Sequence, residues 1–249
     1  MKLKATGACL LVFAFANPVQ AGWLDWLSRP TPPQTASNQS SQAVSLSADE
    51  ITKGLKEALA SGAQKAIKSL GQQDGFLKNL EVKIPMPQSL AEVEKGLRLV
   101  GKEQYADQFV LSMNRAAEAA MTEAGPIVGN AIREMTVDDA GKILNGPDDA
   151  ATRYLQEVGG GKLTERMLPV VKAATAKIGV TAAYKDFVGK AGFVTILVQQ
   201  KELDLDQYVT TKAADGLFKM IAAEEREIRK NPVARSTDLM KKVFGMAGK

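Results

Sequence analysis

The chain has 249 residues and a formal net charge of +4, with one cysteine and no histidine. Without histidine, Ser-His-Asp triads, Cys-His nucleophiles and haem ligation by histidine are excluded, and one cysteine cannot complete a usual zinc site. The 32 basic and 28 acidic residues lack the basic excess of a nucleic-acid-binding protein, so we expect no nucleic-acid partner, no metal and no cofactor.

The first 21 residues have the order of a secretory signal peptide. Two lysines precede an apolar run over residues 5–16, and small residues then lead to Ala21. Cleavage is therefore expected after Ala21, which places the mature protein in the periplasm. A retained membrane anchor needs about 20 continuous apolar residues. Asn17 and Pro18 interrupt the run too early for that alternative.

The single cysteine, Cys9, lies before the end of the apolar run. We expect it to be removed with the signal peptide, because a lipid-bearing cysteine would follow the apolar run. The mature chain then has no disulfide, although the periplasm is oxidising. Removal of residues 1–21 also takes away two lysines and no acid, which lowers the formal net charge to +2.

Residues 22–45 are predicted to be an aromatic N-terminus followed by a flexible linker. Residues 28–45 are rich in Ser, Gln, Pro and Thr and poor in apolar side chains. Both tryptophans of the protein precede this linker. The expected contact residues for a membrane surface or an envelope partner are Trp23, Leu24, Trp26 and Leu27. The alternative is that they pack on a groove of the same molecule.

Residues 46–249 are expected to form one folded domain that begins with a helix. Ser47 and Glu50 have the spacing of a capping box, in which the two residues bind each other's backbone N–H groups. Apolar residues then recur every three or four positions as far as Leu70. Gly71 is a suitable end for this helix.

Residues 72–88 contain turn-forming residues and prolines that exclude a helix interior. They leave room for a turn and one short extended segment near residues 82–86. A second capping box, from Ser89 to Glu92, predicts another helix, which Gly101 ends.

Helical spacing continues through residues 105–121, 126–135, 140–144 and 150–158. The last two runs follow pairs of acids, which favour the positive end of a helix dipole. The three glycines at positions 159–161 predict a break in the chain and a hinge between helices.

The next helix is predicted over residues 163–178, and Pro169 should kink it or mark its true start. A shorter helix follows Gly179. Residues 193–198 are apolar and β-branched, which fits a strand as well as a helix. The strongest helical pattern covers residues 205–231, and a short helix ends the chain.

Roughly nine or ten helices predict an all-α fold, as a single compact multi-helix domain. A domain of this size buries enough surface to fold without a disulfide. Its methionines either fill gaps between helices or line an adaptable apolar pocket.

Three pairs of acids invite a catalytic or metal-binding interpretation, as an acid with a base or as ligands for Ca²⁺ or Mg²⁺. The pairs are Asp138 with Asp139, Asp148 with Asp149, and Asp204 with Asp206. None has the spacing of a calcium loop. All lie near predicted helix starts, so we interpret them as helix caps.

Two further motifs are interpreted as structural. The mixed charges of residues 224–230 predict a solvated helix face, with Glu225 and Arg229 as an ordinary pair four residues apart. Residues 159–162 read Gly-Gly-Gly-Lys, but the earlier glycine and the following Ser or Thr of a phosphate-binding loop are missing.

Several separated segments occur in a characteristic order, and they are residues 53–55, 74–76, 84–87, 113–118, 139–140, 150–155, 215–218 and 242–245. Together these segments resemble the bacterial exported family catalogued as domain of unknown function 4197. The resemblance covers nearly all of residues 46–246. It implies an exported helical protein of Gram-negative bacteria and brings no assigned activity, cofactor or catalytic residue.

These observations favour a non-catalytic periplasmic module that binds an apolar small molecule or an envelope protein, with a weak membrane-surface contact through its N-terminus. One alternative is a carboxylate-dependent hydrolase of envelope glycan, which needs no histidine. Another is a structural or assembly protein tethered to the membrane. The sequence does not predict the oligomeric state.

Overall fold

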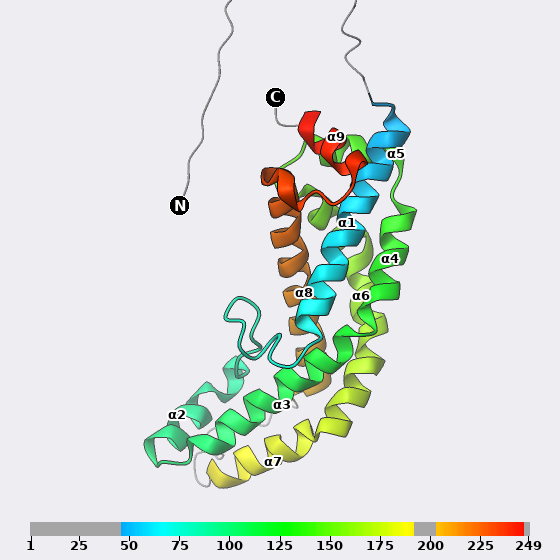
Figure 1. Cartoon of the computed structure of the whole chain (residues 1–249). Coiled ribbons are helices and arrows are strands. Elements are labelled where there is room, and N and C mark those ends of the chain that lie inside the picture. The colour runs from blue at the N-terminus through cyan, green and yellow to red at the C-terminus, as the bar shows by residue number, and fades with distance from the viewer. Residues whose placement is uncertain (1–45, 192–202, 247–249) are drawn as a thin grey trace, which may run out of the picture. The chain divides into compact units, whose positions relative to one another are not determined.

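The computed structural model describes residues 46–191 and 203–246, and these form one compact helical domain (Figure 1). In the described ranges the elements are α1 (Ala48–Leu70), η1 (Gln88–Leu90), α2 (Ala91–Leu99), α3 (Glu103–Met121), α4 (Ala124–Glu134), α5 (Val137–Leu144), α6 (Ala150–Ile178), α7 (Val180–Ala191), α8 (Leu205–Lys230), η3 (Pro232–Ala234) and α9 (Asp238–Met246). No strand occurs among these residues, so the predicted all-α fold is confirmed.

The helices pack around α1, α6 and α8. Helix α1 contacts α8, α9, α4 and α5, while α6 contacts α8, α3 and α4. Helices α2 and α7 pack against α3 at the opposite end of the domain from α5 and α9 (Figure 1). The core between them is apolar, and five methionines lie in it: Met113, Met121, Met135, Met167 and Met240.

Two helices start with a capping box. Ser47 accepts a hydrogen bond from the backbone N–H of Glu50 (3.2 Å), and Glu50 accepts one from the N–H of Ser47 (2.9 Å), as predicted. Thr136 and Asp139 make the same exchange at α5. In both helices, side chains therefore bind the N–H of the N-cap residue and one of the free N–H groups of the first turn.

The capping box predicted from Ser89 to Glu92 is wrong. The chain enters a helical turn earlier, after Pro87, so Ser89 lies within the 3-10 helix η1. Helix α2 then follows Leu90 without a side-chain cap. A serine caps a helix only from the extended backbone that precedes it, and Ser89 has none.

Residues 83–87 have no regular secondary structure, and the short extended segment expected there forms no strand pair with any described residue. A side chain of α3 takes the place of a neighbouring strand. The Asn114 amide accepts from the N–H of Ile84 and donates to its carbonyl oxygen, both at 2.9 Å. This buried pair of hydrogen bonds fixes the loop on α3.

The break predicted at the three glycines is wrong, because α6 is continuous through them and through Pro169. A Cβ atom at Gly159 would lie 3.3 Å from the Cβ of Ala131 on α4. One at Gly160 would lie 3.8 Å from the ring of Phe218 on α8. Gly159 therefore lets α6 lie close to α4, and Gly160 lies beside α8, while Gly161 has open space around it. Packing of α6 against its neighbours offsets the roughly 1 kcal/mol that a glycine costs a helix.

The predicted helix ends at Gly71 and Gly179 are confirmed, and Gly179 has the left-handed backbone (φ 82°) that glycine allows. Pro169 lies inside α6 and does not mark its start. The ambiguous residues 193–198 lie outside the described residues.

We expect Gly216→Ala in α8 to destabilise the protein by about 1–2 kcal/mol, since its Cβ would lie 2.8 Å from the buried ring of Phe76. The matched control is Gly161→Ala, where nothing lies within 4 Å of the new Cβ. That change should stabilise the protein by up to about 1 kcal/mol through helix propensity. Urea unfolding measures both, and equal effects would contradict this account.

Candidate functional site

An open groove with a volume of about 870 Å³ runs between α1 and α4. Its apolar lining combines small residues with a few larger ones. These residues are Ala60, Ala63 and Ile67 of α1 and Gly125, Val128, Gly129 and Ile132 of α4. It is a hollow with an apolar floor on the surface of the domain.

The groove exists because both helices carry small residues where they face it. On α1 the lining positions recur every three or four residues from Asp49 to Lys68, which is one face of a helix. On α4 a Cβ at Gly125 would meet nothing within 4 Å, and one at Gly129 would meet only the Arg133 side chain, at 3.7 Å. No large side chain is present to fill the space.

The rim of the groove has more basic than acidic side chains. The basic ones are Lys53, Lys56, Lys68 and Arg133, and the acidic ones are Asp49 and Glu57. None of the four basic side chains forms an ion pair with a described residue. The rim therefore carries uncompensated positive charge.

Two hydrogen bonds hold part of the rim in place. The Lys56 Nζ donates to the backbone carbonyl of Arg133 (2.8 Å), which joins α1 to the end of α4. Glu57 accepts from the Thr237 hydroxyl at 2.8 Å. Lys53 and Lys68 are exposed on either side of these contacts.

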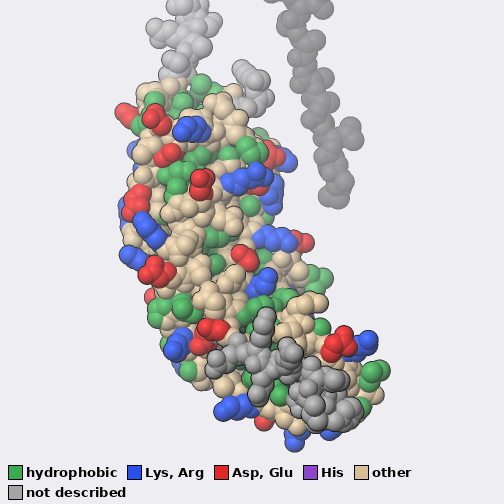
Figure 2. Space-filling model, turned by 180° about the vertical axis from the view of Figure 1, so that it is seen from behind, with side chains coloured by type: hydrophobic (Ala, Val, Ile, Leu, Met, Phe, Trp, Pro, Cys, Tyr) green, Lys and Arg blue, Asp and Glu red, His purple; other side chains and the backbone are tan. Residues whose placement is uncertain are grey.

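A second hollow of about 980 Å³ lies between the 77–88 segment, α2 and α3. Most of its charges are paired, since Arg98 contacts both Glu94 and Asp107 at 2.7 Å and Lys78 pairs with Asp74, while Lys83 forms no ion pair with a described residue. On the face of the molecule in Figure 2, acidic and basic side chains are likewise interspersed among apolar ones. The α1–α4 groove differs from this hollow in its unpaired basic rim.

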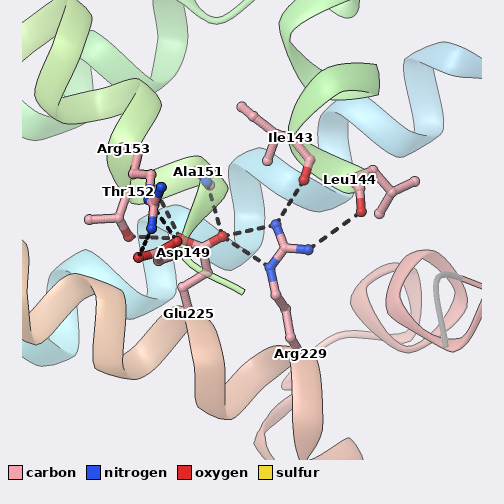
Figure 3. Close-up of polar contacts among 8 residues, drawn as sticks. All are labelled: Ile143, Leu144, Asp149, Ala151, Thr152, Arg153, Glu225 and Arg229. Atoms are coloured by element: carbon pink, nitrogen blue, oxygen red, sulfur yellow. Dashed lines mark hydrogen bonds and ion pairs between the residues drawn. The ribbon is translucent and has the colours of Figure 1, made fainter. Parts of the chain in front are cut away.

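A buried ion pair on α8 joins the end of α5 to the start of α6 (Figure 3). Glu225 accepts hydrogen bonds from the N–H groups of Ala151 (3.0 Å) and Thr152 (2.8 Å) and from the Thr152 hydroxyl (2.7 Å). Arg229 lies 2.9 Å from Glu225 and donates to the Ile143 carbonyl (2.9 Å). Their side chains are only 7% and 9% exposed.

The prediction of a solvated face is therefore wrong for Glu225 and Arg229. The carboxylate caps the N-terminus of α6 and the guanidinium caps the C-terminus of α5, which is the placement that both helix dipoles favour. The signal was present in the sequence, because Glu225 lies on the apolar stripe between Ile221 and Ile228. We expect this pair to be structural, since its hydrogen-bonding groups are already occupied.

A second buried acid, Glu118 of α3, holds the loop after α1. It accepts from the N–H groups of Phe76 (3.1 Å) and Leu77 (3.2 Å). Arg115 lies 2.6 Å from both Glu118 and Asp74. Hydrogen bonds from Lys78 and then from Arg115 hold the pKa of Asp74 below its usual value of 3.8.

The predicted acid pairs are distributed over helix starts and do not form a shared site. Asp139 caps α5 and Asp204 caps α8, as expected. Asp148 pairs with Lys230 at 2.7 Å. Asp149 is the residue before α6 but makes no cap, and Glu225 caps that helix from a distant part of the chain. Across residues 46–191 and 203–246 no group of three potential metal ligands occurs.

The predicted contact residues Trp23, Leu24, Trp26 and Leu27 lie outside the described residues, and their role stays a prediction. Within residues 46–191 and 203–246, no helix has both the length and the apolar character that crossing a membrane requires.

A model of the family described as "Protein of unknown function (DUF4197)" matches residues 45–245. The chain belongs to this family. Searches of curated proteins and of solved structures found no match. The range matched by the DUF4197 model contains the groove and both buried acids. Two of the resembling segments, residues 74–76 and 113–118, meet in the contacts of Asp74, Arg115 and Glu118.

We expect Glu225→Ala to cost about 3–5 kcal/mol, because it leaves the charge of Arg229 buried and two backbone N–H groups without an acceptor. The neighbouring Glu224 pairs with Lys65 on the surface, so Glu224→Ala should cost at most about 1 kcal/mol. Denaturant unfolding of both variants measures the difference. Similar losses in the free energy of unfolding would show that the buried pair contributes no more to stability than the surface pair.

We expect Asp74→Asn to lower the melting temperature at pH 7. Because folding lowers the pKa of Asp74, its charge stabilises the protein above the usual pKa, and this contribution disappears as the pH falls through the folded-state pKa. The difference from wild type should therefore shrink below about pH 4. Asp74 has a left-handed backbone (φ 68°), which asparagine also tolerates. The control is Asp215→Asn at an exposed position of α8. A difference between Asp74→Asn and wild type that stays constant at all pH values would contradict the prediction.

Proposed function

We propose that this protein is a non-catalytic binding module of the bacterial periplasm, and that it holds an apolar ligand or an envelope partner in the α1–α4 groove. The observation that carries the proposal is the groove itself, with its apolar floor and its unpaired basic rim. Its volume lies in the range of ligand sites, about 300–1,000 Å³. The sequence supports export through residues 1–21 and Gram-negative origin through the family resemblance.

The carboxylates of the described residues favour this role over the hydrolase alternative. A glycosidase needs a carboxyl group whose pKa is raised so that it can act as an acid. Where the pKa of a carboxyl group departs from its usual value, hydrogen bonds or nearby cations lower it. These carboxyl groups are Glu50, Asp74, Glu81, Asp139 and Asp148. The two most buried acids, Glu118 and Glu225, bind backbone N–H groups instead.

The N-terminal segment supplies the second part of the proposal. Trp23, Leu24, Trp26 and Leu27 would contact the membrane surface or the same partner, and residues 28–45 would serve as the linker. At random-coil scaling, a linker of this length reaches about 20–25 Å. The groove begins at the first turn of α1, directly after this linker.

Gly129→Leu tests the groove, because the new side chain would project into it. The change lies inside α4 and should stabilise that helix slightly, so lost binding could not be attributed to unfolding. The protein purified from periplasm is analysed by native mass spectrometry, and crosslinking in cells detects protein partners. We expect bound molecules or crosslinked partners of wild type to be lost in the variant.

Gly189→Leu is the matched control. It also adds leucine at a helical glycine with open space around it, but on α7, which does not line the groove. It should retain what wild type binds. If Gly129→Leu retains the same ligands and crosslinks, or if wild type yields none, the groove is not the binding site.

A further inference from the structure

We propose that the occupant of the α1–α4 groove is an acidic amphipathic helix of a partner protein. This rests on the proposed function and adds the chemical class of the partner. Three properties of the described residues lead to it: the length of the groove, the small residues in its floor, and the sign of the charge on its rim.

The groove has the length and openness that a helix requires. Its lining residues on α1 extend from Asp49 to Lys68, about 28 Å at the rise of 1.5 Å per residue, and those on α4 extend from Gly125 to Arg133, about 12 Å, so α4 borders part of this length. A helix of about 18 residues has the same length. A small apolar molecule is usually enclosed so that most of its surface is buried. This groove is open along its length, so it would leave a single acyl chain partly in water.

The floor allows a helix to approach closely. Ala60 and Ala63 of α1 line the groove together with Gly125 and Gly129 of α4, and the two glycines are one helical turn apart. Missing side chains at these positions leave space for leucine-sized side chains of a third helix. The half-buried Ile67 provides a larger apolar surface for them to contact. This is the arrangement in which an amphipathic helix binds with its apolar face in a groove.

The rim selects the charge of that helix. Lys53, Lys56, Lys68 and Arg133 outnumber Asp49 and Glu57, and the exposed Lys53 and Lys68 lie near opposite ends of the groove. Acids flanking the apolar face of a bound helix would complement these lysines. Such rim charges set specificity and association rate more than total affinity.

A second copy of this chain fits the groove less well. The strongly exposed large apolar residues of the described helices are dispersed over separate elements and do not form a stripe along one helix. They include Leu99 and Val100 at the end of α2, Val137 of α5, Val158 of α6 and Met246 of α9. Within residues 46–191 and 203–246, no helix presents a complementary apolar face, which favours a helix of another protein as the occupant.

The test uses the mature chain, residues 22–249, and two designed peptides of about 18 residues, roughly the length of the groove. Both peptides carry leucines on one helical face, and the flanking positions are glutamate in one and lysine in the other. Fluorescence anisotropy measures their affinity at low and high salt. We expect the glutamate peptide to bind about tenfold more tightly, with the difference shrinking at high salt because rim charges are screened.

Three variants locate the binding. Gly129→Leu should weaken binding of the glutamate peptide by about tenfold or more, and Gly189→Leu should leave its affinity unchanged. Lys53→Glu combined with Lys68→Glu should reverse the preference between the two peptides. Both lysines are exposed and unpaired among the described residues, so this double change should preserve the fold.

Other outcomes would overturn the inference. These are equal or tighter binding of the lysine peptide, no binding of either peptide at about millimolar concentration, or a dimer that Gly129→Leu dissociates. Lauric acid serves as the lipid probe. If lauric acid binds wild type but not Gly129→Leu, and the peptides do not bind, the proposed function stands and the helical partner is wrong. If neither the peptides nor lauric acid bind in a manner that Gly129→Leu abolishes, both the proposed function and the helical partner are wrong.

Discussion

The helical arrangement depends on the ion pair of Glu225 and Arg229. Each charge loses several kcal/mol of hydration when it is buried, so the pair stabilises the fold only because its other hydrogen-bonding groups are occupied. Glu225 binds the first turn of α6 and Arg229 binds the last turn of α5. One turn of α8 thus fixes the connection between two other helices. An apolar pair of the same size would fill the space without specifying where α6 begins.

The contacts of Glu118 repeat this arrangement near the other end of α1. Glu225 binds the N–H groups of a helix start, and Glu118 binds those of the loop that follows α1. Each acid is completed by an arginine four or three residues away on its own helix. In both places the C-terminal part of a long helix holds the end or the connection of another element. Helix α1 contacts α8, α9, α4 and α5, while the part of its surface that lines the groove beside α4 stays open.

Local features were predictable from the sequence because they depend on a few neighbouring residues. The capping box at Ser47, the left-handed glycine at Gly179 and the apolar spacing of α8 are of this kind. Glu225 was not predictable as a cap, since the residues that it binds are more than seventy positions away. The groove was not predictable either, because it requires glycines of α4 and alanines of α1 to line it together. Both depend on tertiary packing, which spacing along one helix does not reveal.

The continuous course of α6 through three consecutive glycines has a consequence for the order of folding. An isolated segment of this composition would have little tendency to become helical, because each glycine raises the entropy lost in propagating the helix. The two halves of α6 can form locally, and the glycine turn between them lies beside Ala131 and Phe218 in the folded domain. We expect the centre of α6 to form late in folding, after α4 and α8 have docked beside it. In the native protein the same turn would open together with those contacts, as one cooperative unit.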